Sequence, residues 1–373
     1  MEEVLISPDL LHAIFSSLES EMNHSDGHAA AVCKAWADAW AVILTGRRVV
    51  NMLWSRVLPG RKKPVALAAL PGGELLSVAT ECDCVLLLDK QFRIHRVLGC
   101  GRNTRRSLTL SFTGINGLAA GESGLYVAEA APARVRRLCL EKFTVMAEAT
   151  SELYPDFGEI ALAPNGLLWV IALQPGRVGN RLLGLDALNL ETRFTVTAGD
   201  ADNRRFLPSV LSGLAVYKDR ILVGAFVDPC LIFVLSLDGE PLLRMRTSST
   251  WFDCVPLASP CSLCVVKDRI FWTEAALGGL DNNSNAEDVR RDRRFGRRLV
   301  VQEFTGGFIR REIPGDLSTP RVRTASKPLT QVYNSPKGVG PNSPCFWLAM
   351  CEFDGKLIVA DADGRALLAL QGL

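Results

Sequence analysis

The chain has 373 residues, 48% of them hydrophobic, and its 42 basic and 40 acidic side chains leave a net charge of +2. This composition is typical of a globular protein and excludes a disordered chain, while the length favours two unequal domains or one repetitive domain. The longest apolar runs, such as residues 85–88 and 231–235, have the length of strands, so we expect no membrane span.

Residues 1–44 differ in charge from the rest of the chain. They contain seven acidic residues and one basic residue, a net charge of −6 in a chain whose total is +2. A shift of this size predicts a domain boundary. Ser7 is a good helix N-cap, and the apolar residues that follow it have the spacing of an amphipathic helix. A polar break at 23–27 precedes a second predicted helix over 29–42, and two such helices are too small to bury their apolar faces without a partner.

The two predicted helices carry a pair of short motifs. The first reads Ile6-Ser7-Pro8-Asp9-Leu10-Leu11 with Ile14, Phe15 and Leu18 after it, and the second reads Val32-Cys33-Lys34-Ala35-Trp36. Together they resemble the F-box, although the proline stands one place later than usual and the link between the helices is longer. The resemblance implies that this segment binds a Skp-type adaptor through Ile6, Pro8, Leu10, Leu11, Ile14, Phe15, Leu18, Val32, Cys33 and Trp36.

After residue 60 the chain repeats one theme: an apolar strand, a tight turn, a second strand that ends in a small residue, and a third strand. Six copies run over 65–80, 117–129, 160–170, 213–225, 263–274 and 348–361. Their second strands are spaced by 49, 43, 53, 49 and 87 residues, measured between Val78, Val127, Val170, Val223, Trp272 and Val359. A period of about 40 to 50 residues with several strands per unit predicts propeller blades.

The repeat resembles the NHL and related six-bladed propellers at the level of architecture. We therefore expect a small all-α F-box-like segment over 1–44, followed by an all-β six-bladed propeller over 45–373. The last copy has only three predicted strands, over 346–351, 356–360 and 366–371. Because a propeller closes best when both chain ends share a blade, the apolar segment 49–57 is predicted to be the closing strand.

The spacing of 87 residues indicates inserted material in one blade. Residues 278–298 and 313–344 lack a strand pattern and are predicted to be surface loops. The first contains a basic cluster, Arg290, Arg291, Arg293, Arg294, Arg297 and Arg298, of a kind that can contact phosphates. Because acidic residues interrupt it, we expect a solvated loop and no role in binding nucleic acid.

Three acidic residues end second strands, and they are candidates for a cation site in the central channel, as in six-bladed lactonases. They are Glu129, Glu274 and Asp361, and the equivalent positions of the other copies hold Thr80, Ala172 and Ala225. The set offers too few oxygen ligands, so we expect no metal and no cofactor. No catalytic motif is present, and histidine is almost absent from the repeats, which argues against an enzyme.

Eleven cysteines stand mostly in apolar runs, where they are expected to act as small buried residues in a reducing compartment. The closest groupings, Cys82 with Cys84 and Cys261 with Cys264, lack the further ligands that a structural zinc site requires.

These patterns together predict the substrate-recognition subunit of an SCF-type cullin-RING ubiquitin ligase, located in the cytoplasm and/or nucleus. Its expected partners are a Skp-type adaptor, a cullin scaffold and a client protein that the sequence does not identify. Neither nucleic acid nor a membrane is an expected partner. The alternatives are a scaffold or RNA-binding propeller without catalysis, which would bind RNA with a steep dependence on salt, and a metal-dependent lactonase-like hydrolase.

Overall fold

The computed structural model describes residues 51–99, 110–130, 132–173, 180–197, 207, 211–225, 231–246, 258–266, 269–276, 298–303, 330–334, 347–361 and 365–371. The chain divides into two compact units, one of Met1–Asn51 with Gln371–Leu373 and one of Met52–Leu370. The predicted helices of the F-box-like segment lie outside the described residues, as do the ten predicted adaptor contacts. The fold below is that of the second unit.

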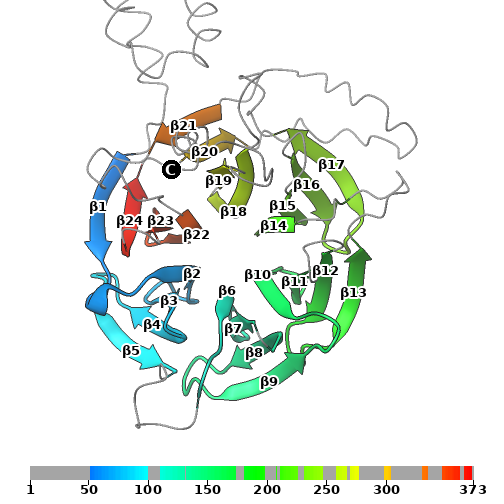
Figure 1. Cartoon of the computed structure of the whole chain (residues 1–373), viewed down its shortest axis with the longest axis horizontal. Coiled ribbons are helices and arrows are strands. Elements are labelled where there is room, and N and C mark those ends of the chain that lie inside the picture. Colours follow the sequence, from blue (N-terminus) through cyan, green and yellow to red (C-terminus); the bar gives the residue numbers. More distant parts are fainter. Residues whose placement is uncertain are drawn as a thin grey trace, which may run out of the picture. The chain divides into compact units, whose positions relative to one another are not determined.

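The described strands form six four-stranded antiparallel sheets arranged around a common centre (Figure 1). Five sheets consist of strands that are consecutive in the chain. The first two are β2–β5 (Pro64–Ala69, Leu76–Thr80, Cys84–Leu88, Ile94–Leu98) and β6–β9 (Ile115–Gly121, Gly124–Glu129, Arg134–Leu138, Val145–Thr150). The next two are β10–β13 (Asp156–Leu162, Leu167–Leu173, Arg181–Asp186, Thr192–Thr197) and β14–β17 (Leu211–Tyr217, Arg220–Ala225, Leu231–Ser236, Pro241–Arg246). The fifth is β18–β21 (Ala258–Val266, Arg269–Ala276, Arg298–Glu303, Thr330–Asn334).

The remaining sheet joins strands from opposite ends of the sequence. Its order is β1-β24-β23-β22, with β22 (Trp347–Phe353), β23 (Lys356–Asp361), β24 (Ala366–Gln371) and β1 (Asn51–Val57). We call it the composite sheet. Directly after β1, the backbone N–H of Leu58 donates a hydrogen bond of 2.9 Å to the carbonyl of Arg365, before the short 3-10 helix η1 (Pro59–Arg61) leads into β2. The prediction of an all-β propeller is confirmed, and the segment predicted to close it lies at the outer edge of the composite sheet.

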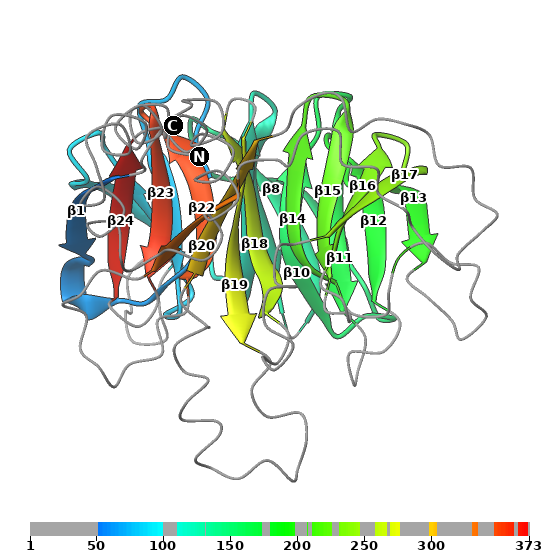
Figure 2. The same cartoon turned by 90° about the horizontal axis from the view of Figure 1, so that it is seen from above.

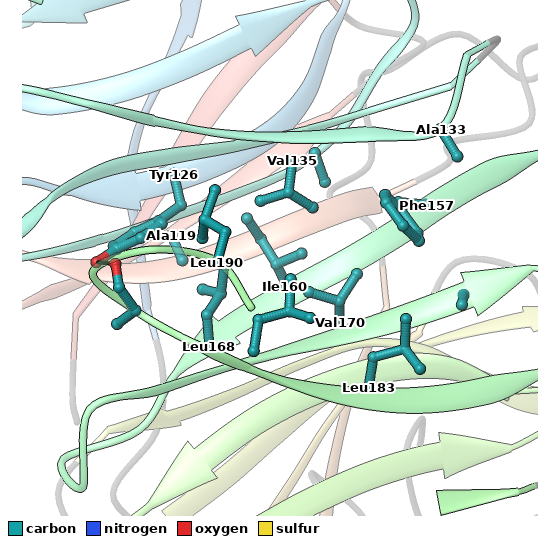
Figure 3. Close-up of a cluster of buried hydrophobic side chains, with 14 of the residues drawn as sticks. Ala119, Tyr126, Ala133, Val135, Phe157, Ile160, Leu168, Val170, Leu183 and Leu190 are labelled. Carbon is teal, nitrogen blue, oxygen red and sulfur yellow. Dashed lines mark hydrogen bonds between the residues drawn. The ribbon is translucent and has the colours of Figure 1, made fainter. Parts of the chain in front are cut away.

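Neighbouring sheets pack face to face, which explains the apolar character of the middle strands. All residues of β3, β4 and β7 are buried because each of these strands has a sheet on both sides, whereas the outer strands β5 and β9 are mostly exposed. Seen from the side, the strands run through the thickness of the ring (Figure 2). Figure 3 shows one such interface, in which Tyr126 and Val135 of one sheet face Leu168 and Leu183 of the next. The Tyr126 hydroxyl also donates to the carbonyl of Ala187, at 2.8 Å.

The predicted hairpin turns are present, and several depend on left-handed backbone. Asp354 and Gly355 both have positive φ, of 52° and 68°, as the tight turn between β22 and β23 requires. Gly166 follows the same rule between β10 and β11. In these two sheets, left-handed residues therefore form the tight turn that the sequence predicts between the first and second strands.

One predicted loop contains a strand. The segment 313–344 was expected to have no strand pattern, yet β21 (Thr330–Asn334) pairs with β20, with Val332 opposite Val300. The prediction was wrong because β21 is only five residues long and is flanked by residues typical of loops. Its β-branched and aromatic residues, Thr330, Val332 and Tyr333, favour a strand but form too short a run to stand out. The rest of that segment and residues 278–297 lie outside the described residues.

A repeated feature of the third turn was not recognised in the sequence. Between the third and fourth strands of three sheets, a buried apolar residue adopts left-handed backbone: Phe92, Phe143 and Leu190, with φ of 59°, 56° and 62°. Such backbone is uncommon for bulky side chains and needs packing to hold it. Phe92 shows why it is tolerated, because its ring packs edge-on against Phe353 of the composite sheet at 5.9 Å between ring centroids.

Candidate functional site

Of the three acidic residues that end second strands, the two whose side chains the structure describes are buried. Glu129 is fully buried within its own sheet, where both carboxylate oxygens are bound by protein groups. Asp361 is buried as well, and the side chain of Glu274 lies outside the described residues. Glu129 does not face the central channel, because second strands lie one position outward from the innermost strands (Figure 1).

Glu129 forms a buried ionic cluster with two arginines of the neighbouring strand. Its Oε1 accepts from Arg136 Nε at 2.7 Å, and its Oε2 accepts from Arg134 Nη2 and from the backbone N–H of Thr113, both at 2.8 Å. The Arg136 guanidinium lies over the ring of Phe112, 4.7 Å from its centroid. Every oxygen of this carboxylate has a donor, so the cluster is a structural element of the β6–β9 sheet.

The innermost strands, β2, β6, β10, β14, β18 and β22, share one irregularity. Each carries a β-bulge near its start, opposite the end of the second strand, at Pro64/Ala66, Ile115/Gly117, Phe157/Ile160, Leu211/Leu214, Pro260/Ser262 and Trp347/Ala349. In each of these strands we compare the residue directly before the one that pairs with the middle of the second strand. It is small in five of the six strands: Ala66, Gly117, Gly213, Ser262 and Ala349. A Cβ on Gly117 would come within 2.7 Å of the carbonyl oxygen of Gly158, so this position faces the neighbouring inner strand at close range.

In β10 this position holds Glu159 in place of a small residue. Its Oε2 accepts a hydrogen bond of 2.7 Å from the backbone N–H of Leu214 on β14, and its carboxyl group is also hydrogen-bonded to Ser262 on β18. One side chain therefore links the inner strands of three successive sheets. Desolvation raises the pKa of Glu159 to about 8, against the opposing effect of the Leu214 N–H and the Ser262 hydroxyl.

We predict that Glu159 makes the protein less stable as the pH rises. The folded state holds this proton up to about pH 8, whereas the unfolded chain releases it near 4.5, so raising the pH between these values favours unfolding. Glu159→Gln keeps an acceptor for Leu214 and cannot titrate. In urea unfolding at a series of pH values, the variant should gain stability relative to wild type from pH 5 to pH 8, by at most about 1.4 kcal/mol per pH unit. Parallel stability curves for the two proteins would contradict this prediction.

Two thiols occupy equivalent positions on adjacent inner strands. Cys264 on β18 and Cys351 on β22 stand where the other four inner strands have alanine, at Ala68, Ala119, Ala161 and Ala215. Desolvation raises the pKa of Cys264 to about 12 and that of Cys351 well above its ordinary value. Both groups therefore remain thiols at neutral pH and serve as small packing residues.

The first of the two predicted cysteine groupings is partly buried. Cys84 is buried, its Sγ lying 3.1 Å from Lys62 Nζ and 3.0 Å from Thr80 Oγ1, while Cys82 is exposed. The side chain of Cys261, in the second grouping, is outside the described residues. Among the residues that the structure describes, no group of three or more His, Cys, Asp or Glu side chains is placed to hold a metal ion.

A pocket of about 220 Å³ opens where the composite sheet meets the β2–β5 sheet. It is lined by Arg56, Val57, Leu58, Pro59, Leu88, Phe92, Arg93, Ile94 and Leu367. We call it the seam pocket, because one of its walls is the composite sheet, which joins the first and last described strands. No sequence motif pointed to it, since its walls come from β1, β24 and the turn between β4 and β5.

Comparison with known proteins adds no relative. No protein-family model matches the chain, and no curated protein matches it. The likeness to the F-box and to NHL-type propellers therefore depends on the residues quoted above.

The described part of the chain contains no helix long and apolar enough to cross a membrane.

Proposed function

We propose that this chain is the substrate-recognition subunit of an SCF-type cullin-RING ubiquitin ligase. In this proposal, the F-box-like segment over 1–44 binds a Skp-type adaptor and the propeller, with the composite sheet as its sixth blade, binds a client protein. The protein itself carries out no chemistry and acts in the cytoplasm and/or nucleus, where adaptor and cullin would meet it. The observation that carries the proposal is the order of the two parts: an acidic segment with both halves of an F-box-like motif, followed by a β-propeller.

The propeller is suited to presenting a client because its described core is rigid and its outer strands are accessible. Buried apolar clusters join neighbouring sheets, so the ring behaves as a stiff support. The outer strands expose large apolar side chains, among them Val97, Val145 and Met146, the last with 57% of its surface exposed. Exposed apolar groups on a rigid support are a common basis for binding another protein.

The adaptor part of this proposal predicts loss of binding when the first predicted helix is altered. Co-expressed with a Skp-type adaptor, the full chain should co-purify with it, and deletion of residues 1–44 should abolish co-purification. Leu11→Glu with Phe15→Glu should have the same effect, because both residues stand on the predicted apolar face. Ser16→Glu is the matched control, since it adds a carboxylate on the polar face of the same predicted helix.

The measurement is the ratio of adaptor to propeller after affinity purification. A full chain that associates with neither adaptor nor cullin would overturn the proposal. Adaptor binding that survives deletion of 1–44 would show that another part of the chain makes the contact.

A further inference from the structure

The seam pocket has an apolar floor and an apolar rim. The floor is made by Leu58, Leu88, Phe92 and Leu367, none of them more than 9% exposed. On the rim, Val57 is 55% exposed and Ile94 is 41% exposed. A dry cavity of about 150 Å³ already holds a benzene ring, so a pocket of about 220 Å³ has room for one large apolar side chain.

The two charged residues that line this pocket are both arginines, and one of them, Arg93, also pairs with Asp89. Arg56 and Arg93 line it, and none of the nine lining residues is acidic. The carboxylate of the nearby Asp89 is held by the backbone N–H of Arg93 and by Arg93 Nε at 3.0 Å, and its pKa is lowered, first of all by the backbone bond. That turn presents the Arg93 side chain outward, with 69% of it exposed. Arg56 is fixed in turn by a bond from Nη1 to the carbonyl of Gln91.

Two strand edges flank the pocket. β1 is the outermost strand of the composite sheet and β5 the outermost strand of the β2–β5 sheet. Neither edge pairs with another of the described strands, and edges of this kind offer backbone donors and acceptors to an extended chain. An extended peptide matches all three features, because alternate side chains can point into the pocket and toward the arginines.

We propose that the seam pocket binds an extended peptide segment in which an aliphatic side chain is flanked by carboxylates. The aliphatic group fills the pocket, and the carboxylates pair with Arg56 and Arg93, as guanidinium geometry favours. Identifying this segment as part of a ubiquitin-ligase client depends on the proposed function, but the binding does not. The adaptor experiment and the experiment below can therefore fail independently.

The test uses the full chain without adaptor and a fluorescein-labelled peptide with a central leucine and two aspartates on each side. Fluorescence anisotropy should give saturable binding with a Kd below about 1 mM. Replacing the leucine by serine, or the aspartates by lysines, should weaken binding at least about tenfold. The same loss is expected for Arg56→Glu with Arg93→Glu, and separately for Ile94→Asp, which leaves both arginines in place. Thermal melting confirms that each variant is folded.

Arg193→Glu is the matched control. Arg193 bonds to Asp186 in the corresponding turn of the β10–β13 sheet, as Arg93 does to Asp89, but it lies away from the pocket. The Arg193→Glu variant should therefore leave peptide binding unchanged. Absence of saturable binding overturns the proposal, as does a loss in Arg193→Glu equal to that in the pocket variants. Equal binding of the serine peptide would show attraction by charge alone and would also overturn it.

Discussion

A chain that begins at Pro59 is expected to melt well below one that begins at Asn51. The shorter chain lacks β1 and Leu58, so it exposes one edge of β24 and opens the interface that contains Leu367 and Phe92. Loss of a buried leucine alone costs about 2 to 5 kcal/mol, which for a domain of this size lowers the melting temperature by about 3 to 7 °C. The exposed edge should also promote aggregation.

Differential scanning calorimetry at one scan rate, with light scattering, provides the comparison. A chain that begins at Gly46 is the control, since it retains β1 together with the residues directly before it and should match the chain from Asn51. Equal melting of the chains from Asn51 and Pro59 would mean that β1 contributes nothing to closure of the ring, and the composite sheet would then not function as a blade.

The largest effect of a single substitution is expected at Glu129. Glu129→Ala leaves the charge of Arg136, which is 5% exposed, without its partner in the protein interior. Breaking a buried pair in this way costs about 3 to 5 kcal/mol. Urea unfolding of the variant should show this loss. Glu148→Ala is the matched control, because Glu148 also contacts Arg134, at 3.9 Å, but is 41% exposed and should matter by less than about 1 kcal/mol.

A double variant distinguishes the buried charge from the lost packing. Glu129→Met with Arg136→Met removes both charges and should recover much of the stability that Glu129→Ala loses. If Glu129→Ala unfolds with nearly wild-type stability, the arginines have found other partners and the cluster is not a determinant of this sheet.

Periodicity in the sequence was sufficient to predict the propeller, and the count of strands in the last repeat was sufficient to locate β1. The radial position of each strand was harder to predict. The second-strand acids do occupy equivalent positions, since Glu129 and Asp361 both pair with the residue before a bulge, at Ile115 and Trp347. Equivalence in the sequence does not give a strand's distance from the centre, so it could not show whether these acids face the central channel.

Other features were missed for different reasons. Glu159 was detectable, because alignment of the repeats places it among alanine, glycine and serine. The seam pocket was not detectable, because its residues come from segments far apart in the chain and its shape depends on the left-handed conformation of Phe92. Local patterns predict strands and turns well, whereas surfaces formed between repeats depend on tertiary packing.

The composite sheet also sets an order of events during synthesis. β1 leaves the ribosome early, and its partner β24 begins only at Ala366. At about 5 to 20 residues per second, the segment that ends at Val57 waits roughly 15 to 60 s for that partner to be translated. Throughout this interval β1 lacks the strand with which it pairs in the composite sheet. The topology therefore delays closure of the composite sheet until β24 has been translated.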